Sequence, residues 1–135
     1  GKNNENSYTL ENTKIKSGKW YGLKDNTGTE EVILSTGTAL QWIMQNKKKF
    51  YNKDIYTIPI WGAKHKKEQP ELSANFSSIT TVEDHIHDCG FGSWFKEAVL
   101  IKKTNQEIRN FALPLEVQYS VGKQEDIMKK MSINK

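Results

Sequence analysis

The chain has 135 residues and a mass of 15.5 kDa, which is the size of one domain and leaves no room for a second independent core. Its 36% hydrophobic and 10% aromatic content suffices for a packed core and excludes wholesale disorder. The formal net charge is +4 and nineteen of the twenty basic residues are Lys, whereas sequence-specific reading of DNA relies mainly on Arg. A sequence-specific DNA-binding protein is therefore not expected.

The beginning of the chain and its cysteine content predict little about compartment. Residues 1–7 are polar and predict a disordered lead-in to a single domain over 8–135. The chain starts at a Gly, as after a cleaved leader or a cloning scar, and the expectation is an exported or surface-tethered protein. Cys89 is the single cysteine, so an intramolecular disulfide is excluded. The apolar run 55–63 is far shorter than the roughly 20 residues that a membrane span needs.

The first half of the chain predicts a hairpin, a helix and a strand. Residues 19–34 hold two extended runs around a turn-rich tetrad, which indicates a hairpin. Residues 38–51 predict the main helix, because Thr38 and Gln41 match a capping box and apolar residues then recur on one face. The β-branched and aromatic run 55–61 predicts a strand, and its proline suggests an edge or a bulge.

The second half predicts two short helices and a second hairpin. A further capping box, followed by Gly90 as a left-handed stop, predicts a short helix near 81–89. The arms 97–103 and 108–121 flank a polar turn, and strict alternation in the second arm predicts a strand that lies over the core. A short amphipathic helix is expected near 123–132.

These elements together predict an α+β fold. Strands before and after one good helix, joined by short turns, indicate a mostly antiparallel, curved sheet packed on the helix at 38–51. No Gly-rich phosphate loop of either common type follows a predicted strand. A parallel, nucleotide-binding sheet is therefore not expected.

The positive charge is concentrated in one segment. Residues 47–67 hold seven lysines and one acid, Asp54, so these 21 residues carry a charge of +6. Aromatic residues are interleaved with the lysines, a mixture that suits an acidic protein face, an anionic surface or single-stranded nucleic acid. The alternative is that the lysines cap a helix and solvate a loop while the aromatic residues face the core. The candidate partner-binding residues are Lys47, Lys48, Lys49, Phe50, Tyr51, Lys53, Trp61, Lys64, Lys66 and Lys67.

A dense cluster of potential metal ligands lies at residues 83–89. If this stretch is a strand, alternate side chains could bind zinc or manganese, whereas a helix would divide them between two faces. The capping box and the following glycine favour the helix. The candidate ligands in the metal-dependent alternative are Asp84, His85, His87 and Asp88.

Two short motifs resemble known families. His85-Ile86-His87 resembles the His-hydrophobic-His element of rolling-circle nucleases and small transposases, which implies a tyrosine nucleophile on a later helix. The tyrosine available downstream, Tyr119, falls in a predicted strand. Gly18-Lys19-Trp20 resembles the Gly-x-Trp that opens lipocalin-type barrels, which implies a hollow interior for a small ligand and an arginine, here Arg109, over the tryptophan.

The leading hypothesis is a small, non-enzymatic binding module that engages an acidic macromolecule through residues 47–67, without a cofactor and without a membrane span. The first alternative is a metal-dependent hydrolase or nuclease that uses His85 and His87 with zinc or manganese. The second is a lipocalin-like binder of a small ligand. The identity of the partner and the oligomeric state do not follow from the sequence.

Overall fold

The computed structural model of the chain describes residues 15–100, 102, 105–113 and 131–133. Within these ranges a six-stranded sheet has the order β5-β4-β2-β3-β1-β6. Its strands are β1 (Tyr21–Leu23), β2 (Glu31–Thr36), β3 (Asp54–Ile58), β4 (Ser78–Glu83), β5 (Glu107–Ala112) and β6 (Met131–Ile133). The helices are α2 (Leu40–Gln45), α3 (Gln69–Ser73) and α4 (Phe91–Leu100), with 3-10 turns η2 (Lys47–Phe50) and η3 (Ala63–His65). None of the described helices has the length and apolar character to cross a membrane.

The expected mixture of helices and strands is confirmed, but the mostly antiparallel pairing is wrong. β2 lies parallel to both β3 and β4, and β4 lies parallel to β5. Among the described residues, the antiparallel pairs are those that β1 forms with β3 and with β6. Strand β3, which follows β2 in the sequence, lies on one side of β2 in the sheet, and the next strand, β4, lies on the other side. This reversal of direction is the switch point of an open, doubly wound sheet.

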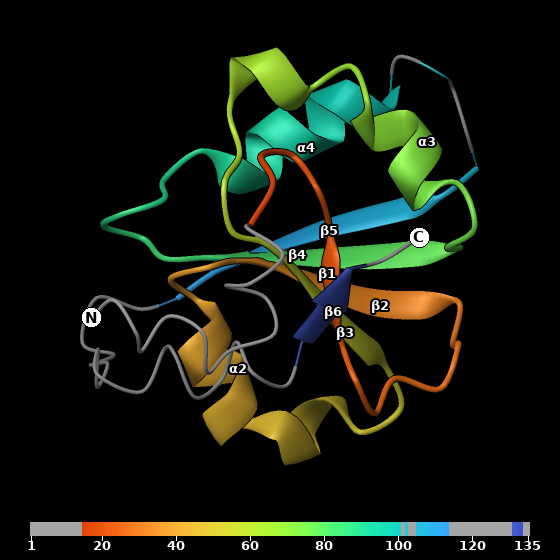
Figure 1. Cartoon of the computed structure of the whole chain (residues 1–135), viewed down its shortest axis with the longest axis vertical. Coiled ribbons are helices and arrows are strands. Elements are labelled where there is room, and N and C mark those ends of the chain that lie inside the picture. Colours follow the sequence, from red (N-terminus) through yellow and green to blue (C-terminus); the bar gives the residue numbers. More distant parts are fainter. Residues whose placement is uncertain (1–14, 101, 103–104, 114–130, 134–135) are drawn as a thin grey trace.

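Helices cover the sheet on both faces rather than on one (Figure 1). Helix α2 packs on one face with Ile33 and Ile55, in a core that also holds Leu40 and Ile43. Helices α3 and α4 lie together on the opposite face (Figure 1). The core beneath them contains the buried side chains Trp20, Val32, Leu34, Tyr56, Ile58, Ile79, Phe91, Trp94, Phe95 and Val99.

The two-sided cover explains the composition of the central strands. β3 is buried at all five positions, and β2 at every position after Glu31. A strand covered on both faces needs a continuous apolar run rather than alternation, which is typical of parallel sheets. In α4, apolar residues at 91, 94, 95, 98 and 99 follow the helical spacing and are all buried. That spacing is the sequence signal for α4.

Three predictions for the first half of the chain need correction. Strands form near the expected places in 19–34, but β1 pairs with β3 and β6 instead of forming a hairpin with β2. The main helix is confirmed only in part, because α2 is short and continues into η2. Its predicted capping box is absent, and the Thr36 hydroxyl accepts the Ala39 N–H at 3.1 Å instead. The strand at 55–61 is confirmed over β3 and lies inside the sheet, not at its edge.

The second half differs more strongly. Residues 78–83 are strand β4, and residues 84–90 are turns, so the helix near 81–89 is wrong. Residues 91–100 are helix α4, which removes the hairpin predicted over 97–121. β5 matches the start of its second arm but is an edge strand parallel to β4. Most of that arm, and most of the helix near 123–132, lie outside the described residues; Met131–Ile133 is strand β6.

Candidate binding site

The structure separates the basic segment 47–67 into two groups of lysines. One group lies on η2 and just after it, where the chain enters β3, and the other lies on and around η3, after the chain leaves β3. In Figure 1 the two turns lie on opposite sides of the sheet. β3 has five residues at about 3.3 Å per residue, so it separates the groups by roughly 15 Å. They do not form one continuous patch along the chain.

A polar pocket of about 280 Å³ lies at the amino end of β3, beside the first group of lysines. It is formed by the loop between β1 and β2 and by the segment from η2 to β3. Four of the candidate partner-binding residues line it: Lys47, Phe50, Tyr51 and Lys53. The other lining residues are Leu23, Asp25, Asn26, Thr27, Thr29, Asn52, Asp54 and Ile55.

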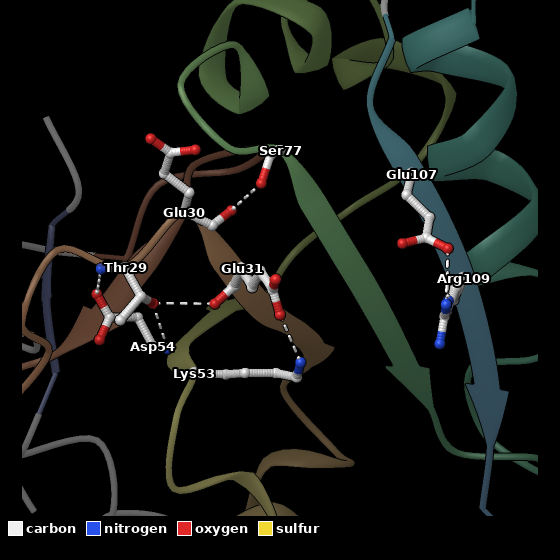
Figure 2. Close-up of polar contacts among 8 residues, drawn as sticks. All are labelled: Thr29, Glu30, Glu31, Lys53, Asp54, Ser77, Glu107 and Arg109. Carbon is white, nitrogen blue, oxygen red and sulfur yellow. Dashed lines mark hydrogen bonds and ion pairs between the residues drawn. The ribbon is translucent and has the colours of Figure 1, made fainter.

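The carboxylate of Asp54 holds one wall of the pocket in place. It is only 4% exposed, and it accepts backbone N–H groups from Thr27 at 2.8 Å, Gly28 at 2.6 Å and Thr29 at 3.0 Å. The Thr29 hydroxyl in turn accepts the Asp54 N–H and donates to the Glu31 carbonyl, both at 2.9 Å (Figure 2). Gly28 has a φ of 93°, a left-handed conformation that glycine adopts without strain. The loop is therefore ordered by its hydrogen bonds to Asp54 before any partner binds.

Asn26 fixes the same loop to the next residue of β3. Its amide donates to the Ile55 carbonyl and its side-chain oxygen accepts the Ile55 N–H, both at 3.0 Å. The adjacent phenol of Tyr56 is buried. Burial raises the pKa of Tyr56 and the Asp54 carboxylate raises it further, while a hydrogen bond with Asn26 acts in the opposite direction. Tyr56 is consequently kept neutral in the folded chain well into the alkaline range.

The two lysines of the pocket form exposed ion pairs. Lys47 lies 2.6 Å from Asp25, and Lys53 lies 3.0 Å from Glu31 (Figure 2 shows the second pair). The acidic partners are exposed, with 64% and 60% of their side-chain surface accessible. Exposed pairs of this kind contribute about 0–1 kcal/mol each. Carboxylates of another molecule could therefore replace Asp25 and Glu31 at little cost.

Aromatic residues provide the apolar part of the surface. Tyr51 is 81% exposed, the largest exposure among the exposed large hydrophobic residues of the described chain. Phe50 is half-buried and packs edge-on against Trp42, at 6.1 Å between ring centroids. The Lys49 ammonium lies 5.8 Å from the Trp42 centroid, and Lys48 is exposed. Tyr51 is thus the residue of this group best placed to contact a partner.

None of the lysines of the second group lines this pocket. Lys66 forms an ion pair with Glu97 of α4 at 2.7 Å, while Lys64 and Lys67 are exposed. Trp61 packs against Phe91 and Trp94, at 5.2 and 5.3 Å between centroids, and belongs to the margin of the core under α4. The contacts of Trp61 therefore match the alternative in which the aromatic residues of the segment face the core.

The candidate metal residues lie in the turn between β4 and α4. Asp84 accepts the N–H groups of Ile86 and His87 at 2.8 Å each. His85 and His87 are exposed, and one carboxylate oxygen of Asp88 is buried without a hydrogen-bond partner. Among the described residues, no group of three or more His, Cys, Asp or Glu side chains is placed to hold a metal ion.

The contacts of the lipocalin-like motif also differ from the resemblance. Trp20 is fully buried and donates its indole N–H to the Gln69 side chain at 2.9 Å. Arg109 lies at the outer edge of the sheet, where it pairs with Glu107 (Figure 2). The arginine expected over the tryptophan is therefore paired elsewhere.

No protein-family model matches the chain, and no curated protein sequence is significantly similar to it.

Sequence reasoning found the lysines and aromatic residues of the pocket but not its polar wall. From the sequence, Asp54 is only the single acid within the basic segment, and the tetrad 25–28 is predicted to be a hairpin turn. An Asp at the first position of a buried strand was the available signal, because a carboxylate there needs several donors close by. The turn-rich sequence 25–28 supplies those donors.

Proposed function

We propose that the chain is a non-enzymatic binding module that takes an acidic protein surface at the pocket beside the amino end of β3. The observation that carries the proposal is the convergence of Lys47, Lys53 and the exposed Tyr51 on one preformed pocket. The interaction surface is accordingly the first part of the basic segment, 47–53, rather than the whole of 47–67.

Binding would proceed by exchange of ion pairs. A partner carboxylate would take the place of Asp25 on Lys47, and another would take the place of Glu31 on Lys53. The ring of Tyr51 would pack on the partner, since exposed tyrosines bury a large area at low cost in side-chain entropy. Because Asp54 and Asn26 already order the loop, little conformational entropy would be lost on binding.

The charge balance favours a protein surface over a nucleic acid. The pocket lining contains two lysines and two aspartates, so the formal charge of the lining is zero, and Lys48 and Lys49 of the same segment lie outside it. A phosphate backbone brings a dense row of negative charges and needs an excess of unpaired cations. Single carboxylates at protein spacing require only the two exchanges described above.

The experiment is a titration of the chain with a Glu- and Tyr-containing peptide, a single-stranded oligothymidylate and vesicles that carry an anionic lipid. Chemical shifts of backbone amides identify the residues that contact each probe. We expect the peptide to shift the resonances of residues 47–53 and 24–29, with an affinity that falls as the salt concentration rises. Tighter binding of the oligonucleotide or the vesicles than of the peptide would refute the choice of a protein surface.

Two matched double variants locate the site. The Lys47→Gln, Lys53→Gln variant removes both charges of the pocket, and Lys64→Gln, Lys67→Gln removes the same charge at the other end of β3. We expect the first to weaken peptide binding at least about tenfold and the second to change it less than about threefold. Equal losses in the two variants would show diffuse attraction to lysine and would contradict the pocket.

A further inference from the structure

Among the described residues, the outer edge of β5 has no neighbouring strand and carries self-complementary charges. β5 is the last strand of the sheet order, and in the described part of the chain β4 is the strand that it pairs with. Its six side chains are exposed except for Ile108, which is half-buried. Open edges of this length expose backbone groups that can pair with another strand.

The register with β4 shows which backbone groups face outward. The N–H of Glu107 donates to the Ser77 carbonyl, and the N–H of Leu113 donates to the Glu83 carbonyl. In a parallel pair, alternate residues direct their backbone groups to the same neighbour. The odd-numbered residues of β5 therefore bond to β4, and the N–H and C=O groups of Ile108, Asn110 and Ala112 point away from the sheet.

The charges of this strand sit on one face at a spacing of two residues. Arg109 donates from Nε and a terminal nitrogen to one carboxylate oxygen of Glu107, at 3.0 and 2.7 Å. Both side chains are exposed, at 68% and 54% (Figure 2). Residues two apart in a strand point to the same face, so the pair lies on the α2 side of β5, as does Phe111, which contacts Trp42.

We propose that the outer edge of β5 pairs antiparallel with the same edge of a second copy of the chain, with Glu107 of each copy opposite Arg109 of the other. A two-fold axis then passes between the two Ile108 residues, whose outward backbone groups bond to each other. Glu107 and Arg109 form the directly opposed pair in which side chains approach most closely. The next register along the strand would place Arg109 opposite Arg109, which repulsion between like charges disfavours.

The interface would be small. Pairing along one six-residue strand buries less surface than a permanent dimer needs, so we expect a weak, concentration-dependent dimer. Sedimentation equilibrium of the full chain measures it, at protein concentrations up to about 1 mM. A chain that remains monomeric over the whole range would overturn the proposal.

Charge variants test the register. Arg109→Glu places two acids opposite each other, and we expect the dimer dissociation constant to rise roughly tenfold. The double variant Glu107→Arg, Arg109→Glu restores both opposed pairs and should restore the wild-type value. Lys66→Glu breaks the exposed ion pair between Lys66, just after η3, and Glu97 of α4, and it should leave dimerisation unchanged. Failure of the double variant to recover dimerisation, or an equal effect of Lys66→Glu, would overturn the proposed register.

Hydrogen exchange supplies a readout that does not depend on charge. Within one copy the amides of Glu107 and Arg109 point to β4, whereas those of Ile108 and Asn110 point away from the sheet. At high protein concentration we expect the Ile108 and Asn110 amides to become protected at least about tenfold, and those of Lys64 and Lys67 to stay unchanged. If the Ile108 and Asn110 amides exchange equally fast at all concentrations, the edge is not the interface.

Discussion

At the scale of single residues, the buried carboxylate of Asp54 connects β3 to the loop between β1 and β2. A carboxylate removed from water costs several kcal/mol unless donors compensate for the loss. Asp54 receives three backbone N–H groups from consecutive residues of one loop. Charge-assisted bonds of this kind are stronger than neutral ones. The same contacts that make the burial of Asp54 tolerable also shape the pocket.

Tyr56, two residues after Asp54 in β3, makes the free energy of unfolding depend on pH in the alkaline range. Its pKa is raised above the ordinary value by burial and then by the Asp54 carboxylate. The folded state therefore holds the phenolic proton more tightly than the unfolded state. The resulting stabilisation is fully present below the unfolded pKa of about 10 and is lost as the pH rises through the folded pKa. We expect Tyr56→Phe to flatten the fall in the free energy of unfolding above pH ~10.

Urea denaturation at a series of pH values from about 8 to about 11 checks this prediction. Exposed Tyr51 supplies the control, because Tyr51→Phe should leave the slope of the wild-type chain unchanged. A Tyr56→Phe chain as sensitive to alkali as the wild type would contradict it.

At the scale of elements, Glu83 connects the end of β4 to the start of α4. Its buried carboxylate accepts the Gly92 N–H at 2.7 Å and the Gly90 N–H at 3.1 Å. The first N–H groups of a helix have no partner within the helix, and a negative charge near them is favourable. Glu83 thus fills the place that an external anion could otherwise take at α4.

Replacement of Glu83 by Gln should destabilise the chain. The amide keeps one acceptor oxygen but presents its NH₂ to the second backbone donor, and we expect a loss of about 2 kcal/mol in the free energy of unfolding. Glu97→Gln on the exposed side of the same helix should cost less than about 0.5 kcal/mol. Urea denaturation measures both, and hydrogen exchange in the first turn of α4 should accelerate only in Glu83→Gln. Equal costs for the two variants would show that the cap contributes nothing.

The same residue explains why the sequence predicted a helix where β4 lies. The pattern from Thr80 to Glu83 fits a capping box, and it also fits a strand with three β-branched residues. The glutamate does cap a helix, but α4 begins eight residues later instead of at this site. Local spacing cannot distinguish these cases, because the deciding hydrogen bonds depend on the turn at 84–90. The helix at 40–45 and strand β3 could be predicted, since their local patterns and their burial agree.

The parallel pairing of the strands could not be predicted from local sequence patterns either. β1 and β2 are adjacent along the chain and separated by a turn-rich loop, which is the usual signal of a hairpin. The loop instead bonds to Asp54 and Ile55, and β3 comes to lie between the two strands. For the candidate site, the lysines and Tyr51 could be predicted from the sequence. The opposite wall of the pocket, formed by the loop between β1 and β2, depends on this long-range pairing and could not.

At the scale of the whole molecule, the two faces of the sheet share their central strands. Val32 and Leu34 belong to the core under α4, and Ile33 between them belongs to the core under α2. Loss of packing on one face therefore releases strand β2 from the other face as well. The physical consequence is that the two layers should unfold together.

Two large-to-small substitutions test this coupling. Ile43→Ala in α2 and Phe95→Ala in α4 remove fully buried side chains from opposite layers. We expect losses of about 2–5 and about 3–5 kcal/mol in the free energy of unfolding, respectively. In native-state hydrogen exchange, each substitution should lower the protection of β2 and of the helices on both faces by the same free energy. A substitution that lowered the protection of its own helix alone would show that α2 or α4 unfolds independently of the sheet. We expect the opposite, because β2 and β3 are covered on both sides and neither layer has a complete core of its own.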